Sequence, residues 1–149
     1  MEQIYHAFQS AFWKEEQGSY ETNFWREIGT RSRYRQSSNL VPLAFGLVPE
    51  DRVSVVVKNL IQDIHEKGDH LDTGCVGTRH LLPVLSDYGY GELAYRILTN
   101  QTYPSWNFCI QESGVCTWEM WEASTRSLDH YFLGTYDAWL YGYLVGIRN

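Results

Sequence analysis

Hydrophobic residues recur every three or four positions in several stretches of the chain, which is the spacing of one face of an amphipathic helix. One stretch covers residues 4 to 12, the clearest covers 53 to 64, and the last runs from about 128 to 147. A further helix is expected over the segment GELAYRILTN. Alternating strand-like runs are scarce, so the pattern predicts a mainly α fold. The three stripes consist of Ile4, Ala7, Phe8, Ala11 and Phe12, of Val53, Val56, Val57, Leu60, Ile61 and Ile64, and of Phe132, Tyr136, Trp139, Leu140, Tyr143 and Ile147.

Helix-ending and loop-forming residues divide these stretches. Pro49 and the two acidic residues after it favour a helix start, and Lys67 followed by Gly68 favours its end. The segment QSSNLVPLAFGLV is a less regular helix candidate because Pro42 interrupts it. Residues 69–78, DHLDTGCVGT, read as a structured loop. Successive helical hairpins fit an up-and-down bundle, a solenoid or a toroid, and no fixed-period repeat favours the solenoid.

Size and charge narrow the class of protein. The chain has 149 residues, the size of one domain, and its 44% of hydrophobic residues suits a folded core. Its net charge of −6, without a cluster of Lys and Arg, argues against a nucleic-acid partner. No apolar run approaches the ~20 residues that span a membrane, and the N-terminal segment lacks the pattern of a signal peptide. We therefore expect no membrane partner and a cytoplasmic location.

Cysteines and histidines show no metal-binding pattern. The three cysteines have no CxxC spacing, which argues against a zinc site or a disulfide scaffold and suits a reducing compartment. The histidines at 65, 70 and 80 have no carboxylate partners at metal-ligand spacing. We expect neither a metal nor a cofactor.

The segment CTWEMWEAS places Glu119 between Trp118 and Trp121. Glycoside hydrolysis normally needs two carboxyl groups, and a glutamate flanked by aromatic faces is a candidate for one of them. The alternative is a partly exposed glutamate whose tryptophan neighbours pack inward, and spacing alone favours this second reading. Both remain open at this point.

Two further side chains are candidates for substrate contacts. His130, in the segment SLDHY, is suited either to orienting a substrate hydroxyl or to capping a helix. Asp72, together with Thr73 and Thr78, either faces a cleft or satisfies the backbone of its own loop. The spacing of these residues does not decide between the alternatives.

Several blocks, taken in order, resemble a known family. They are PLAFGLVPED, DIHEKGDHLDTGCVGTRHLLPVLSDYGYGELAYRIL, TYPSW, TWEMW and SLDHYFLGTYDAWLY, and they cover about residues 36 to 147. Together they look like the C-terminal half of the catalytic domain of bacterial α-L-rhamnosidases, glycoside hydrolase family 78. The resemblance implies that residues 1–149 form a single unit, a C-terminal portion that makes up about half of an (α/α)6 toroid, a six-hairpin glycosidase. It also implies carbohydrate metabolism, with hydrolysis that inverts the anomeric centre and releases L-rhamnose from rhamnose-containing glycosides.

The resemblance also assigns roles to residues. Glu119 matches the general base of the family's W-E-x-W motif, and Trp118 and Trp121 match the tryptophans expected to line the sugar pocket. His130 matches the histidine of an S-x-N-H-Y block and is expected to contact rhamnose hydroxyls, with Asp72 as a further substrate-binding candidate. Departures from the family pattern, which has Arg, Asp and Asn at these places, are Met120, Glu122 and Asp129.

The general acid of the family belongs to an Asp- and Arg-rich segment that residues 1–35 do not resemble. We therefore expect the chain to carry the base without the acid and to be inactive alone. Its uncovered helix faces favour association, either with the missing N-terminal half of the barrel or with a second copy in a homodimer. The alternatives are a non-catalytic sugar-binding or interaction module derived from this fold and a toroid glycosidase for another sugar.

Overall fold

The computed structural model describes residues 2–21, 34–113 and 116–147, and helices dominate them. The N-terminal helix α1 (Glu2–Phe12) leads into a short antiparallel hairpin of β1 (Trp13–Lys14) and β2 (Ser19–Tyr20). The central helices are α2 (Gln36–Ala44), α3 (Glu50–Glu66), α4 (Cys75–Asp87) and α5 (Gly91–Thr99). The C-terminal part holds α6 (Trp106–Ser113), a 3-10 turn η2 (Leu133–Thr135), α7 (Tyr136–Trp139) and a π-helical segment η3 (Leu140–Leu144).

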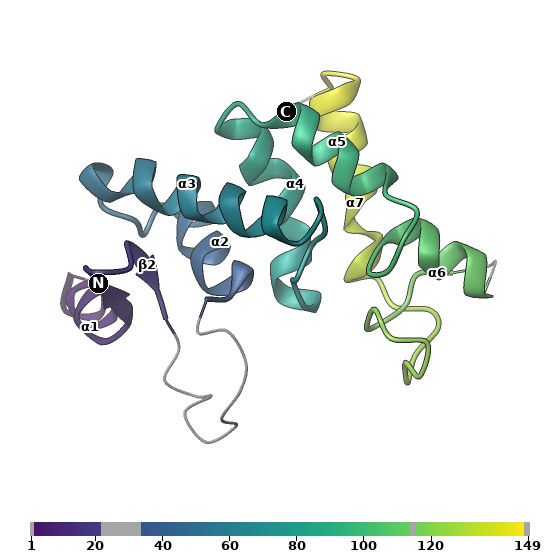
Figure 1. Ribbon diagram of the computed structural model, residues 1–149, viewed down its shortest axis with the longest axis horizontal. Coiled ribbons are helices and arrows are strands. Elements are labelled where there is room, and N and C mark those ends of the chain that lie inside the picture. The colour runs from purple at the N-terminus through teal and green to yellow at the C-terminus, as the bar shows by residue number, and fades with distance from the viewer. Residues whose placement is uncertain (1, 22–33, 114–115, 148–149) are drawn as a thin grey trace.

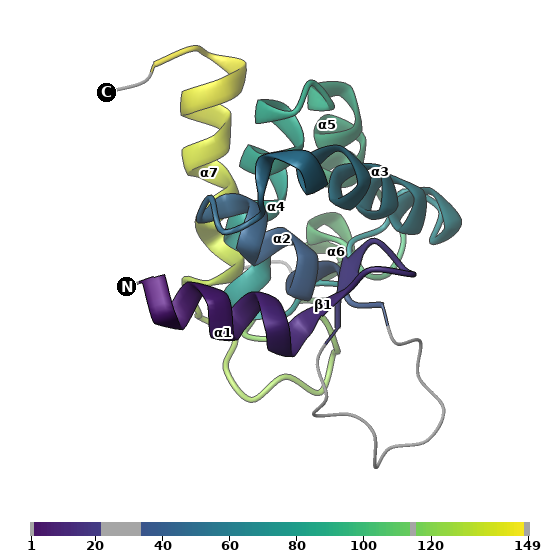
Figure 2. The same ribbon diagram turned by 90° about the vertical axis from the view of Figure 1, so that its left-hand side faces the viewer.

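Helices α2, α4 and α7 are successive neighbours, since α4 contacts both of the others. Helix α3 packs on α2, and α5 packs on α4, so that each joins its neighbour in a helical hairpin. Helix α1 lies at one edge of the molecule (Figure 1), and the side view separates it from α7 and α5 (Figure 2). The row of helices therefore has two ends, one at α1 and α2 and the other at α7.

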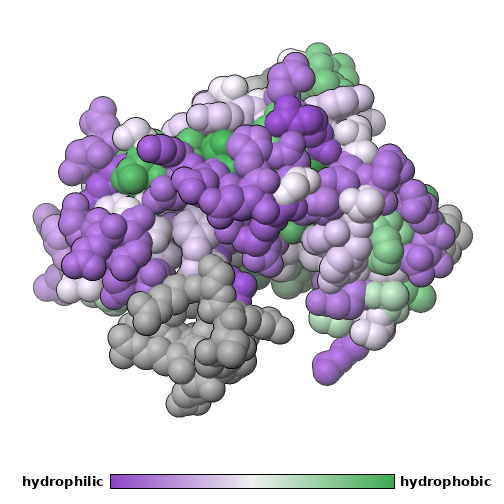
Figure 3. All heavy atoms as spheres, in the orientation of Figure 1, coloured by the Kyte–Doolittle hydropathy of each residue, from purple (hydrophilic) through white to green (hydrophobic). Residues whose placement is uncertain are grey.

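Helix α3 shows why the hydrophobic pattern predicts the fold. Its expected stripe is buried from Val56 to Ile64, while its polar residues face outward and make the front of the molecule mostly hydrophilic (Figure 3). The helix ends at Glu66, and Gly68 adopts a left-handed φ of 69°, as the Lys-Gly signal predicts. The core consists mainly of residues of this kind from α2 to α5, together with Trp106, Trp118, Trp121, Leu133 and Trp139.

The interrupted segment around Pro42 does form a helix, α2, with Pro42 in its last turn. The loop predicted over 69–78 is shorter than expected, because α4 begins at Cys75 and takes up its last four residues. The pattern does not predict α6 or the β1–β2 hairpin, which are both short.

The last helix differs most from its prediction. A helix from about residue 128 was expected, but helical structure begins only at η2, and α7 begins at Tyr136. The reason is tertiary: the amide of His130 donates to the carbonyl of Thr117 at 2.8 Å, so this segment pairs with an earlier loop. Beyond Trp139 the chain continues as the π-helical segment η3. No helix among the described residues is long and apolar enough to cross a membrane.

Candidate functional site

Glu119 and His130 belong to one loop, residues 116–132, which connects α6 to η2 (Figure 1). Two bonds of 2.8 Å join the stems of this loop: the His130 amide donates to the Thr117 carbonyl, and the Thr117 hydroxyl donates to the His130 carbonyl. The amide of Glu119 also donates to the carbonyl of Ser127 at 3.1 Å. The backbone on both sides of Glu119 is therefore fixed by the loop itself.

Both tryptophans of the TWEMW segment point into the core. Trp118 is 2% exposed and Trp121 is 7% exposed. The indole N–H of Trp121 donates to the carbonyl of Thr73 at 2.8 Å, and the edge of its ring meets Trp106 at 5.2 Å between centroids. Trp118 meets Phe108 edge-on at 6.5 Å. The two rings anchor the loop on each side of Glu119, which itself is only partly buried.

Beside these rings lies a cavity of about 370 Å³. Glu119 and His130 are not among its lining residues. Burial raises the pKa of the Cys109 thiol to about 11, so this group stays protonated near neutral pH. The cavity is lined by Trp106, Cys109, Ile110, Cys116, Thr117, Trp118, Trp121, Leu133 and Tyr136.

Asp72 lies in the loop between α3 and α4, with its side chain 39% exposed. Its carboxylate is 3.6 Å from Arg35 and 3.5 Å from Lys67, and its amide donates to the side-chain carbonyl of Gln36 at 2.6 Å. The loop is thus held by a fully buried glutamine, while the carboxylate remains accessible. Thr73 and Thr78 are buried, and their hydroxyls form a hydrogen bond of 2.9 Å with one another. This bond stabilises the loop and the start of α4.

The loop of Asp72 and the loop of Glu119 meet. The Trp121–Thr73 bond joins them directly, next in sequence to Asp72. Burial raises the pKa of Tyr103, and the charges of Glu122 and Asp72, one from each loop, raise it further. The sequence reading missed this junction because the Thr73 acceptor is a backbone carbonyl, which no residue type marks.

His130 is partly buried, and aromatic neighbours fix its ring. It stacks on Phe132 at 4.8 Å and on Tyr131 at 5.6 Å between centroids. The amide of Phe132 lies 3.5 Å from its Nδ1 and donates to it. The roles assigned to Glu119, Trp118, Trp121, His130 and Asp72 remain predictions. The described residues contain no group of three His, Cys, Asp or Glu side chains positioned to hold a metal ion.

Helical hairpins in a row, with a carboxylate-bearing loop at the end of one of them, are features of the helical-toroid class of glycosidases. The family model described as the bacterial α-L-rhamnosidase six-hairpin glycosidase domain matches residues 1–144, and the chain belongs to this family. The mainly α fold and its place within a six-hairpin domain, both expected from the sequence, are confirmed.

Relatives named α-L-rhamnosidase are much longer than this chain. One from Formosa agariphila is 40% identical over 122 residues, which is 76% of this chain and 13% of the relative. Another from Streptomyces avermitilis is 34% identical over 122 residues, 75% of this chain and 12% of the relative. The chain thus spans only about an eighth of the length of these relatives.

Solved structures agree with the sequence matches. The structure of α-L-rhamnosidase from Dictyoglumus thermophilum superposes with a TM-score of 0.82 at 38% identity, covering 99% of this chain and 16% of that one. The Streptomyces avermitilis α-L-rhamnosidase complexed with L-rhamnose gives a TM-score of 0.80 at 30% identity, covering 99% and 14%.

Proposed function

We propose that this chain is part of an inverting glycoside hydrolase that releases L-rhamnose from α-L-rhamnosides, with Glu119 as the general base. The observation that carries the proposal is the anchoring of Glu119. Buried Trp118 and Trp121 fix the loop on each side of it, while the glutamate between them is only partly buried. A base that activates water needs both a fixed position and access to water.

An inverting mechanism needs a second carboxyl group, the acid, about 6.5–9.5 Å from the base so that water fits beside the sugar. We infer that this acid comes from the remainder of the six-hairpin domain, since the relatives extend far beyond the part that this chain matches. The chain alone then holds one half of the catalytic pair. We expect the chain to be inactive by itself and to act only as part of a complete barrel.

The other candidate residues have supporting roles in this proposal. The half-exposed carboxylate of Asp72 and the ring of His130 are suited to hydrogen bonds with sugar hydroxyls. Trp118 and Trp121 would act mainly as anchors of the loop, because their rings are buried and Trp121 already uses its N–H group. The support for rhamnose as the sugar is the match to a relative solved with L-rhamnose.

The experiment compares two proteins with p-nitrophenyl α-L-rhamnoside as substrate. One is this chain alone. The other is a chimera in which it replaces the matched segment of the Dictyoglumus thermophilum enzyme. We expect release of nitrophenol from the chimera only, and NMR should show the β-anomer of rhamnose first. Turnover by the chain alone, or the α-anomer as first product, would contradict the proposal.

A non-catalytic module is the second candidate, favoured by the aromatic cavity beside Trp118 and Trp121. Calorimetry of the chain alone with L-rhamnose tests it. Binding to the chain, combined with no turnover by the chimera, would replace the catalytic proposal by this one.

A further inference from the structure

Tyr103 lies in the connection between α5 and α6, which comes between the loops of Asp72 and Glu119 in the chain. The residue is 48% exposed, and its hydroxyl forms no hydrogen bond with any residue that the structure describes. Its ring is nevertheless held in place, because its edge meets Phe108 at 5.2 Å between centroids. Tyr103 thus combines a fixed ring with an accessible hydroxyl, which suits a contact with a ligand.

A side-chain hydrogen bond joins this connection to the loop of Asp72. The ring Nε2 of His70 lies 2.9 Å from the hydroxyl of Thr102, the residue before Tyr103. His70 is in turn two residues before Asp72. The backbone at Tyr103 is therefore tied to the backbone at Asp72 by a bond that lies close to both in sequence.

A row of aromatic rings joins the same connection to the loop of Glu119. Phe108, which contacts the ring of Tyr103, meets Trp118 edge-on at 6.5 Å between centroids. Trp118 is buried and is the residue before Glu119. The loops of Asp72, Tyr103 and Glu119 are therefore connected through packed or hydrogen-bonded neighbours.

The surroundings of Tyr103 favour its protonated form. Burial raises the pKa of its phenol, and the charges of Glu122 and Asp72 raise it further. The phenol therefore keeps its proton near neutral pH and is available as a hydrogen-bond donor. Ionised carboxylates only accept hydrogen bonds, so Tyr103 adds a donor to a site whose other two loops offer acidic acceptors.

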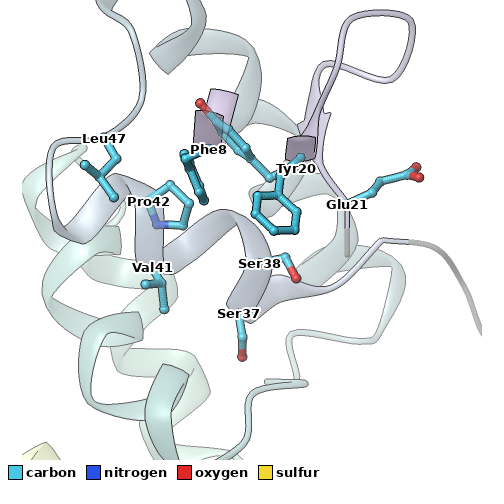
Figure 4. Close-up of a pocket in the computed structure, with 9 residues that line it drawn as sticks. Phe8, Tyr20, Glu21, Ser37, Ser38, Val41, Pro42 and Leu47 are labelled. Carbon is cyan, nitrogen blue, oxygen red and sulfur yellow. The ribbon is translucent and has the colours of Figure 1, made fainter. Parts of the chain in front are cut away.

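Tyr20 shows how a structural tyrosine of the same chain differs. Figure 4 shows it beside Phe8 and Pro42 in a mostly apolar groove of about 310 Å³ between α1, β2 and α2. Tyr20 is 1% exposed, and its hydroxyl donates to the side-chain carbonyl of Gln9 at 2.9 Å. The fold thus uses both the ring and the hydroxyl of Tyr20, but only the ring of Tyr103.

We propose that Tyr103 is a specificity-determining residue of the candidate site, whose phenol hydroxyl donates a hydrogen bond to a hydroxyl oxygen of the bound glycoside. This inference deepens the proposed function and rests on it for the identity of the ligand. The hydroxyl belongs to rhamnose or to the sugar to which rhamnose is attached, and the choice of substrate distinguishes these two sources.

The test uses the chimeric enzyme with two kinds of substrate. One is p-nitrophenyl α-L-rhamnoside, together with analogues that each lack one ring hydroxyl of rhamnose. The other is a disaccharide in which L-rhamnose is linked to glucose. Tyr103→Phe keeps the ring and should lower kcat/KM by about fivefold or more on a substrate that carries the contacted hydroxyl.

The pattern of losses identifies the contact. A loss on the nitrophenyl substrate assigns the hydroxyl to rhamnose, and one analogue should then be hydrolysed equally by wild type and Tyr103→Phe. A loss on the disaccharide alone assigns it to the second sugar. Tyr95→Phe is the matched control, since Tyr95 is 47% exposed but lies on α5, outside the three loops. Its kcat/KM should stay within about twofold of the wild type.

Three results would overturn the inference. They are equal activity of wild type and Tyr103→Phe on every substrate, an equal loss on every substrate and analogue, and a loss in Tyr95→Phe as large as that in Tyr103→Phe. The second result would show a structural role, because a lost contact to one hydroxyl cannot affect a substrate without it.

An inactive wild-type chimera would contradict the proposed function, and Tyr103 is then tested by binding. Calorimetry with L-rhamnose and with the disaccharide should show that Tyr103→Phe weakens affinity for one of them by about fivefold. Absence of binding, or equal affinities of wild type and Tyr103→Phe for both sugars, would overturn the inference about Tyr103 as well.

Discussion

The indole N–H of Trp121 donates a 2.8 Å hydrogen bond to the carbonyl of Thr73, 48 residues earlier in the chain. Both residues are buried, at 7% and 2% exposed. Asp72 is next to Thr73, and Glu119 is two residues from Trp121. One buried bond therefore fixes the distance between the two loops that carry the carboxylates of the candidate site.

Replacing Trp121 by Phe should destabilise the chain by about 1–3 kcal/mol, because the buried carbonyl of Thr73 loses its donor. Chemical denaturation monitored by circular dichroism measures this loss. Trp13→Phe is the matched control: it removes an indole N–H bonded to Glu15 at 2.6 Å in an exposed position, where water replaces the lost partner. Equal losses of stability in the two variants would show that ring size, and not the buried bond, decides the effect.

Gly77→Ala should destabilise the contact between α2 and α4. A β-carbon at this position would lie 3.1 Å from the β-carbon of Ser37 and close to its hydroxyl, which overpacks the interface. We expect a net loss of about 1 kcal/mol even after the gain in helix propensity. Gly74→Ala is the control, because its added β-carbon meets nothing within 4 Å. In a Ser37→Gly background most of the loss from Gly77→Ala should disappear, leaving only the contact of 3.3 Å with the β-carbon of Thr73; an undiminished loss there would show that Ser37 is not its cause.

Asp69 should make the stability of the chain depend on pH. Burial of its carboxyl acts to raise the pKa, but hydrogen bonds from Arg96 and His65 outweigh it and hold the pKa below its ordinary value of 3.8. The stabilisation is therefore fully present above pH 3.8 and is lost as the pH falls through the lower pKa of the folded state.

Asp69→Asn tests this dependence, since Asn tolerates the left-handed φ of 59° that Asp69 adopts. The difference in unfolding free energy between wild type and variant should shrink as the pH falls below 3.8. Arg96→Gln, which removes the donor 2.9 Å from the carboxylate, should reduce the same difference. If the difference in unfolding free energy between wild type and Asp69→Asn does not change with pH, the pKa of Asp69 is not lowered in the folded state.

How far the sequence predicts the structure depends on how local each cause is. The stripe of α3 and the Lys67–Gly68 ending follow from neighbouring residues, and both are confirmed. The late start of α7 follows from the pairing of His130 with Thr117, a contact across 13 residues that periodicity does not report. Helix α6 was missed because, among residues 106–112, whose burial is described, only Trp106 and Cys109 are buried, too few to form a stripe.

The same distinction applies to the site. Spacing alone favours tryptophans that pack inward, and Trp118 and Trp121 do so. The resemblance to rhamnosidases singled out the glutamate between them, and packing of the two rings is compatible with a functional glutamate because it fixes the loop. The junction with the Asp72 loop depends on a backbone carbonyl, so no residue pattern predicts it.

Glu119→Gln in the chimeric enzyme is the most direct test of the base. The substitution keeps the shape of the side chain and removes its ability to take a proton from water, so kcat should fall by about 10²–10⁴-fold while KM changes little. Glu122→Gln is the matched control: it lies in the same loop, three residues further on, and is exposed. It removes the same charge from the site, so a purely electrostatic role for the loop would lower kcat equally in both variants. A base at Glu119 instead predicts a loss of less than about tenfold for Glu122→Gln, and full activity of Glu119→Gln would refute the assignment.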